Sequence, residues 1–370
     1  MLPRWAATVR RWLVAVGLIR QAKLRWLVVV LAAVTLASAV TAVAGTTMTP
    51  QQEAIATLLE SFNPSTGLIG TSWWQAAVAL STLETYAETT GDTGDDAVIA
   101  SAFAHHAQSK FEDSSDDDTA WWGLAWLQAY HLTHNPAYLS MAETDADYIH
   151  QAWDSTCGGG IWWQRDPRSY KNAISNELFL ELTARLHNTI RGDTKYLAWA
   201  NAEWSWFQGS GMINQNGLVN DGLDNNCQNN GQTTWTYNQG VILAGLAALY
   251  KATRNRSLLT EAERIGTAAI SHLTVDHVLT EPCPDNCTGT LDPDILAFKG
   301  IFVRDLKVLA ATAGTSRYNS FFRAQARAIE SRDTDSNHDL GMFWSGPVAD
   351  ITPASQASAA AALVASLDLP

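Results

Sequence analysis

Apolar side chains recur at helical intervals in several blocks along the chain, and each block ends in a polar turn. The blocks cover residues 74–86, 122–130, 177–187 and 239–250. They are rich in Ala, Leu, Glu and Gln, whereas the alternation of β-branched residues that marks strands is scarce. Turns such as Thr133-His134-Asn135 separate each block from a second helical stretch. The pattern predicts an all-α protein built from helical hairpins.

The blocks repeat at intervals of roughly 50 to 60 residues, which is typical of a helical-hairpin array. The repeats are few and no polar capping repeat is evident, so we expect about six hairpins to close into a toroid. Three segments rich in Gly, Asn and Trp would then form loops over a central cleft: 155–170, 209–239 and 280–300. No linker divides the chain, which predicts one domain over residues 46–370.

The first 44 residues have a different composition from the rest. They carry six Lys and Arg side chains and no acid, and an apolar run starts at Leu27. Ala42-Val43-Ala44 fits a signal-peptidase site. We therefore expect residues 1–44 to be a secretory signal peptide and the protein to be secreted, to the extracellular space or cell wall. An uncleaved membrane anchor is the alternative, because Leu27–Ala44 is near the minimum of about 18 residues for a span.

Charge excludes one class of partner. The chain has 24 Lys and Arg against 37 Asp and Glu, and without the first six bases the balance is 18 − 37 = −19. Such a protein should repel nucleic acid, and we expect no stable membrane partner beyond the signal segment. Sixteen tryptophans are unusually many, and three Trp-Trp pairs suggest ring-lined clefts: Trp73-Trp74, Trp121-Trp122 and Trp162-Trp163.

An even number of cysteines in a chain predicted to be exported favours disulfides. They are Cys157, Cys227, Cys283 and Cys287. A short local Cys283–Cys287 bridge would leave Cys157 to pair with Cys227, but all three pairings remain open. The chain has no Cys-x-x-Cys pair and no histidines at ligand spacing beside the cysteines, so we expect no metal site. Two N-glycosylation sequons begin at Asn255 and Asn286.

Two adjacent acids, Asp117 and Asp118, precede Trp121-Trp122 at the head of the second helical block. Paired carboxyl groups beside indole rings suggest cleavage of a glycosidic bond, because one acid can protonate the leaving oxygen and the other can act at the anomeric carbon. An acidic helix start explains the same residues without any catalytic role.

Longer strings favour the catalytic interpretation. Gly158-Gly159-Gly160-Ile161-Trp162-Trp163 and Gln232-Thr233-Thr234-Trp235-Thr236-Tyr237-Asn238-Gln239-Gly240 follow the acid pair in order. With Thr280-Glu281-Pro282-Cys283 and Phe298-Lys299-Gly300 after them, the chain resembles glycoside hydrolase family 76, the α-1,6-mannanases. The resemblance runs from about Gly70 to the last Ala-rich stretch.

This resemblance implies an (α/α)6 barrel and retaining cleavage of α-1,6-mannosidic bonds, with no metal or cofactor. It implies that Asp117 is the nucleophile and Asp118 the general acid/base, and it leaves Asp116 outside the motif. Backbone geometry agrees, since neighbouring residues can place their carboxyl groups about 5 Å apart, the separation of retaining enzymes.

The remaining polar and aromatic residues of these segments are candidates for binding sugar. They are Trp121, Trp122, Trp162, Trp163, Asp221, Asp224, Trp235, Tyr237, Asn238, Gln239 and Lys299. Each has a structural alternative: the aspartates could cap turns, the tryptophans could pack the barrel, and the amides could satisfy helix ends. Lys299 could contact substrate or pair with an acid.

Three functions remain open. The first is an endo-acting hydrolase of α-1,6-mannan or other mannose-containing glycans. The second is a cell-wall transglycosidase that moves mannoprotein glycans onto wall glucan. Residues 354–370 suggest a last barrel helix rather than the lipid-anchor signal of fungal transglycosidases, which favours a released enzyme. The third is a catalytically inactive carbohydrate-binding protein, and the presence of both aspartates argues against it.

Overall fold

The computed structural model describes residues 48–283 and 292–369. The chain divides into a unit that ends at Met48 and a second unit that starts at Thr49, which is the unit described below. The predicted signal peptide lies outside the described residues, as do Cys287 and the sequon at Asn286. Within the described ranges, no helix is both long and apolar enough to cross a membrane.

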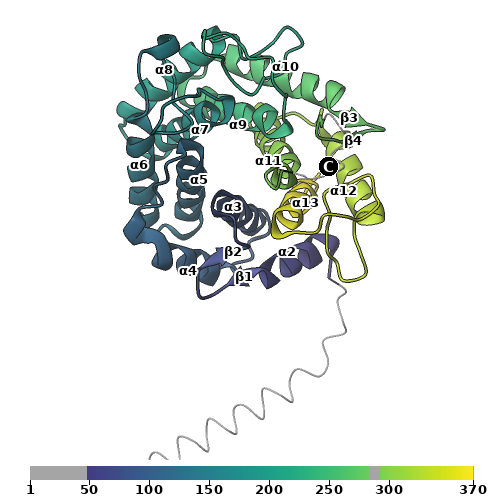
Figure 1. Cartoon of the computed structure of the whole chain (residues 1–370). Coiled ribbons are helices and arrows are strands. Elements are labelled where there is room, and N and C mark those ends of the chain that lie inside the picture. Colours follow the sequence, from purple (N-terminus) through teal and green to yellow (C-terminus); the bar gives the residue numbers. More distant parts are fainter. Residues whose placement is uncertain (1–47, 284–291, 370) are drawn as a thin grey trace, which may run out of the picture. The chain divides into compact units, whose positions relative to one another are not determined.

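Six of the described helices form a closed inner ring. Each contacts the next, and the last contacts the first (Figure 1). In chain order they are α3 (Trp73–Thr90), α5 (Asp116–Thr133), α7 (Ala173–Thr189), α9 (Thr236–Thr253), α11 (Ile295–Ala313) and α13 (Pro353–Ala365). The predicted toroid is therefore confirmed.

A second layer of described helices surrounds this ring (Figure 1). Its members are α2 (Pro50–Glu60), α4 (Asp96–His106), α6 (Pro136–His150), α8 (Lys195–Gly209), α10 (Arg256–His272) and α12 (Asn319–Arg332). Five inner helices are each followed in the chain by their outer partner. The sixth pair joins opposite ends of the unit, because α2 packs on α13 and Gln356 Nε2 donates to the Ala54 carbonyl at 3.0 Å. The architecture is an (α/α)6 barrel.

Short elements fill the connections. β1 (Phe62–Asn63) pairs with β2 (Leu68–Ile69), and β3 (Thr274–Val275) pairs with β4 (Val278–Leu279), both antiparallel. Two single 3-10 turns, η1 (Ala107–Ser109) and η2 (Thr156–Gly158), lie before α5 and α7.

The polar turns between inner and outer helices have a clear local cause. His134 adopts a left-handed conformation, and its N–H donates to the Tyr130 carbonyl at 2.8 Å, which ends α5. Asn135 then caps α6 by accepting from the Ala137 N–H at 3.1 Å. The turn at 253–255 repeats this arrangement between α9 and α10. The repeating turn seen in the sequence is thus a stop signal followed directly by a start signal.

Glycines allow the inner helices to approach closely. A Cβ atom on Gly300 of α11 would lie 2.4 Å from the Ser358 Cα of α13. On the other side, a Cβ atom on Gly240 of α9 would lie 2.6 Å from the Phe302 Cα of α11. Both contacts lie near the starts of these helices, so they bring together the loops that carry the candidate site.

Candidate active site

Three consecutive acids form the first turn of α5. Ser115 occupies the N-cap position, and the helix dipole favours the negative charges that follow it. Asp116 is fully buried, whereas Asp117 and Asp118 are only partly buried. The acidic helix start considered from the sequence therefore exists. Asp117 Oδ1 is also buried and has no hydrogen-bond partner in the described part of the chain, so the feature that distinguishes Asp116 is its ion pair.

Asp116 is held by an ion pair that reaches across the chain. Its Oδ1 accepts from Arg165 Nη2 at 2.6 Å, and the Arg165 guanidinium carbon lies 3.4 Å from the centroid of the Tyr148 ring. The Asp116 N–H donates to the Trp163 carbonyl at 2.8 Å, and the Arg165 N–H donates to the Ser114 carbonyl at 3.1 Å. These contacts fix the start of α5 against residues 163–165 and so orient the acids that follow.

The pKa values of Asp117 and Asp118 are both raised. Burial is the main cause in each case, and it raises the pKa of Asp117 to about 7 and that of Asp118 to about 8. The negative charge of Asp117 raises the pKa of Asp118 further, while backbone N–H groups at the helix start act in the opposite direction on Asp117. Two such neighbours share one proton near neutral pH. The pair can therefore present one acid and one carboxylate.

Other acids face the same region from neighbouring helices. Tyr237, in the first turn of α9, has its pKa raised by burial and then by the charges of Asp221, Asp117, Glu177 and Asp294. Electrostatic effects of this kind weaken with distance. Acids from α5, α7, the loop before α9 and the start of α11 therefore all lie within electrostatic range of Tyr237.

Aromatic rings connect these helix starts. Trp74 donates from Nε1 to Asp294 Oδ1 at 3.0 Å and stacks on Trp121 with ring centroids 5.8 Å apart. Phe298 stacks on Tyr237 with centroids 3.9 Å apart. Both Trp74 and Tyr237 keep part of their surface exposed. Partly exposed rings beside carboxyl groups are suited to contact a sugar ring.

Asp221 belongs to this cluster. Its Oδ2 accepts from the Tyr170 hydroxyl at 2.5 Å, and that hydroxyl accepts from Asn230 Nδ2 at 2.8 Å. Burial raises the pKa of Asp221, and the hydrogen bond from Tyr170 acts in the opposite direction. The predicted residues Asp221, Tyr237 and Asn238 are thus brought together.

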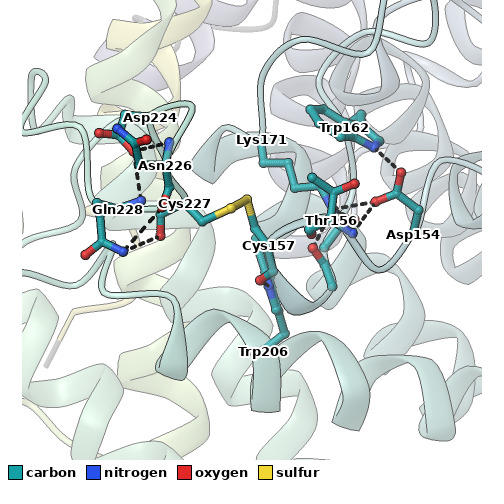
Figure 2. The surroundings of a disulfide bond; sticks show 12 residues. Asp154, Thr156, Cys157, Trp162, Lys171, Trp206, Asp224, Asn226, Cys227 and Gln228 are labelled. Atoms are coloured by element: carbon teal, nitrogen blue, oxygen red, sulfur yellow. Dashed lines mark hydrogen bonds and ion pairs between the residues drawn. A yellow bond between two sulfur atoms is a disulfide. The ribbon is translucent and has the colours of Figure 1, made fainter.

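A buried lysine organises the glycine-rich loop before α7 (Figure 2). Lys171 donates from Nζ to Asp154 Oδ1 at 3.0 Å, and Asp154 Oδ2 accepts from Trp162 Nε1 at 2.8 Å. The same ammonium donates to three carbonyl oxygens of the loop, those of Thr156, Gly159 and Gly160. The loop is therefore folded around a single positive charge, and Trp162 is held at its edge.

A disulfide ties this loop to a second one. Cys157 and Cys227 are bonded, which selects one of the pairings left open by the sequence (Figure 2). The bridge leads to an exposed turn in which Asp224 accepts from the N–H groups of Asn226 and Gln228 at 2.8 and 2.9 Å. These bonds lower the pKa of Asp224 and give it a turn-capping role. Its contact with sugar stays a prediction.

Several other predicted residues make structural contacts. The Gln239 amide bonds the backbone of Val219 through both of its ends, at 2.7 and 2.8 Å. Lys299 is buried and donates to the Met342 carbonyl at 2.5 Å. Trp122 is only 1% exposed and stacks within the core. The sugar-binding roles of these residues, and of the partly exposed Trp163 and Trp235, also stay predictions.

The family model for glycosyl hydrolase family 76 matches residues 35–368. The chain belongs to this family. Two similar relatives are the Saccharomyces cerevisiae mannan endo-1,6-alpha-mannosidases DFG5 and DCW1, which are 29% and 30% identical over 74% of this chain. The matches cover 65% and 66% of those proteins, so the chain spans less than two thirds of their length.

Solved structures of family 76 share the fold. The GH76A alpha-1,6-mannanase from Salegentibacter sp. HEL1_6 has a TM-score of 0.77 at 24% identity, covering 87% of this chain and 99% of that one. Dfg5 from Chaetomium thermophilum, solved with glucosamine, has a TM-score of 0.76 at 22% identity, covering 86% of this chain and 89% of that one.

Some residues of this candidate site were not assigned from the sequence. Arg165 lies 49 residues from Asp116, and no local pattern connects the two. Tyr170 and Asp294 had no assigned role either, although Asp294 precedes an inner helix much as Asp117 begins one. Among residues 48–283 and 292–369, no group of His, Cys, Asp and Glu side chains could hold a metal ion.

Proposed function

We propose that this chain is a retaining endo-glycosidase that cleaves α-1,6-mannosidic bonds, with Asp117 as nucleophile and Asp118 as general acid/base. One observation carries the proposal: two adjacent, partly buried carboxyl groups share a helix start, and both of their pKa values are raised. In this arrangement one group can protonate the leaving oxygen while the other attacks the anomeric carbon.

The substrate follows from the relatives and from the chemistry of the surroundings. An inactive variant of the Salegentibacter mannanase, with two consecutive aspartates replaced by asparagine, forms a complex with alpha-1,6-mannotriose. In this chain, the charge of Asp294 acts on both members of the acid pair, and Asp117, Asp221 and Asp294 all act on the partly exposed Tyr237. Such groups can stack on pyranose faces and accept hydrogen bonds from hydroxyls. We therefore propose an α-1,6-mannan as the substrate.

We further propose that the protein acts outside the cell. The Cys157–Cys227 bridge supports an oxidising compartment. The basic and apolar pattern of the first 44 residues points the same way.

The test is an assay of the full chain on linear α-1,6-mannan, with reducing ends as the readout. Asp117→Asn and Asp118→Asn should each lower turnover on the order of a thousandfold or more, because each removes an interaction made in the transition state. Asp276→Asn is the matched control, since it removes the same charge from an exposed hairpin turn. Wild-type turnover in both acid-pair variants would sink the assignment.

Transfer to a sugar acceptor is the second candidate. The acid pair is partly buried among aromatic rings, which can restrict the access of water to a glycosyl intermediate. The same assay with a mannose-terminated acceptor separates the two outcomes. A transglycosidase would give longer glycans with few new reducing ends, whereas a hydrolase would give reducing ends at the same rate with or without acceptor.

A further inference from the structure

A cavity of about 450 Å³ opens at the other end of the inner ring, away from the acid pair. All six inner helices contribute to its wall. On α5 it is lined by Gln128 and His131, which follow Asp118 by 10 and 13 residues. A rise of 1.5 Å per residue places these side chains roughly 15 to 20 Å along the barrel axis from the acid pair. The cavity is therefore a separate site.

Its floor offers an unsatisfied acceptor. Glu181 is 3% exposed, and its Oε1 accepts from Arg185 Nη1 at 3.0 Å. Its other oxygen, Oε2, is buried without a hydrogen-bond partner in the described part of the chain. A buried acceptor left without a donor costs about 1 to 3 kcal/mol. A ligand that brings a hydroxyl group to this oxygen would remove that cost.

Its mouth is basic. His131 and Lys251 are exposed at the rim, with the partly buried Arg185 also in the wall. Burial lowers the pKa of both rim groups, and the positive charge of Arg185 lowers each further, so the three lie within electrostatic range. Lys251 has no ion-pair partner among residues 48–283 and 292–369. The lowered pKa of His131 favours its neutral form, so the positive charge at the rim comes from Lys251 and Arg185. In a chain of net charge −13, these two side chains form a local site of attraction for an anion.

The size and lining define the ligand further. An inorganic anion alone would leave most of the 450 Å³ unfilled and would not reach the floor. The described lining residues include no Trp, Tyr or Phe, so the cavity has no platform for stacking a sugar ring. Arginine and lysine together are well suited to a phosphate group. We propose that this cavity binds a phosphorylated polyol or sugar, with the phosphate on Lys251 and Arg185 and a hydroxyl group on Glu181 Oε2.

Isothermal titration calorimetry on the full chain, in a phosphate-free buffer, tests this directly. Mannose 6-phosphate is the probe, with mannose and inorganic phosphate as comparison ligands. The proposal predicts that mannose 6-phosphate binds at least tenfold more tightly than either. Lys251→Met should weaken its binding at least tenfold, whereas Arg327→Met, the same loss of charge on the exposed face of α12, should leave it unchanged.

Glu181→Gln tests the proposed contact at the floor of the cavity independently of the phosphate contact at its mouth. It should weaken the binding of mannose 6-phosphate while leaving that of inorganic phosphate unchanged. Equal affinity for inorganic phosphate and mannose 6-phosphate would refute the polyol contact. Wild-type affinity in Lys251→Met, or no binding of mannose 6-phosphate at all, would overturn the site. None of these results depends on whether Asp117 and Asp118 cleave mannan.

Discussion

Replacing Arg165 with Met would test whether the Asp116 ion pair positions the start of α5. Asp116 is 0% exposed, and the Arg165 side chain is 19% exposed, so the change leaves a buried carboxyl group without its counter-charge. Breaking a buried pair in this way costs about 3 to 5 kcal/mol when the remaining group stays charged. If Asp116 takes up a proton instead, the loss falls to about 1 kcal/mol for a hydrogen bond.

The cost should therefore depend on pH. Burial raises the pKa of Asp116 to about 7, although Arg165 acts in the opposite direction, and the unfolded value is about 3.9. A group whose folded pKa is raised stabilises the fold below its unfolded pKa and loses that contribution as pH rises through the folded value. Removing Arg165 raises the folded pKa further. The variant should thus lose about 1 kcal/mol at pH 5 and about 2 kcal/mol at pH 8, because one pH unit above a wild-type pKa of about 7 adds only about 1.4 kcal/mol to the loss of the hydrogen bond.

Urea unfolding followed by tryptophan fluorescence at both pH values measures this difference. Arg327→Met is the control and should change the unfolding free energy little at either pH, because the side chain is exposed on α12. An equal loss at pH 5 and pH 8, or a loss below about 1 kcal/mol at pH 8, would refute a buried, positioning ion pair.

Three further predictions concern stability. Replacing both Cys157 and Cys227 with Ser should lower the unfolding free energy by about 4 kcal/mol, because the bridge closes a loop of 70 residues; denaturant titration that shows no loss would contradict this. Burial raises the pKa of Glu177 well above its usual range, so the stability that its protonated form contributes is lost as pH rises, and the Tm should fall between pH 5 and pH 8. Glu177→Gln should make this fall in Tm smaller. A fall as large as that of the wild type would exclude Glu177 as a cause. Gly300→Ala should cost about 1 to 3 kcal/mol by pressing on Ser358, and a wild-type Tm would show that α11 and α13 can separate freely.

The sequence predicts the repeating part of this fold well, because local signals determine it. Helical periodicity marks the inner helices, and the turn at 133–135 is a helix stop and cap that any context would favour. The pairing of α2 with α13 carries no such signal. It depends on closure of the ring by segments about 300 residues apart, which hydrophobic patterning alone does not specify.

The candidate site also has one part that the sequence predicts and one part that it does not. The acid pair and the residues near Tyr237 lie in contiguous strings, so sequence patterns locate them. Arg165 meets Asp116, and Asp294 comes near Asp117, only because the barrel closes, and no spacing along the chain reveals them. Asp224 is the opposite case. Its place on a glycine-containing turn suggested a contact with sugar, but its Oδ1 accepts hydrogen bonds from backbone N–H groups of its own exposed turn.

The central claim is that Asp117 attacks the sugar while Asp118 handles the proton, and trapping the intermediate tests it most directly. In Asp118→Asn, an α-mannobiosyl fluoride needs no acid to leave, but the later attack by water lacks its base. Mass spectrometry of the digested protein should then find a mannobiosyl group esterified to Asp117, and it should find none when Asp117 is also replaced with Asn. An adduct on a different carboxyl group, or none in Asp118→Asn, would contradict this account.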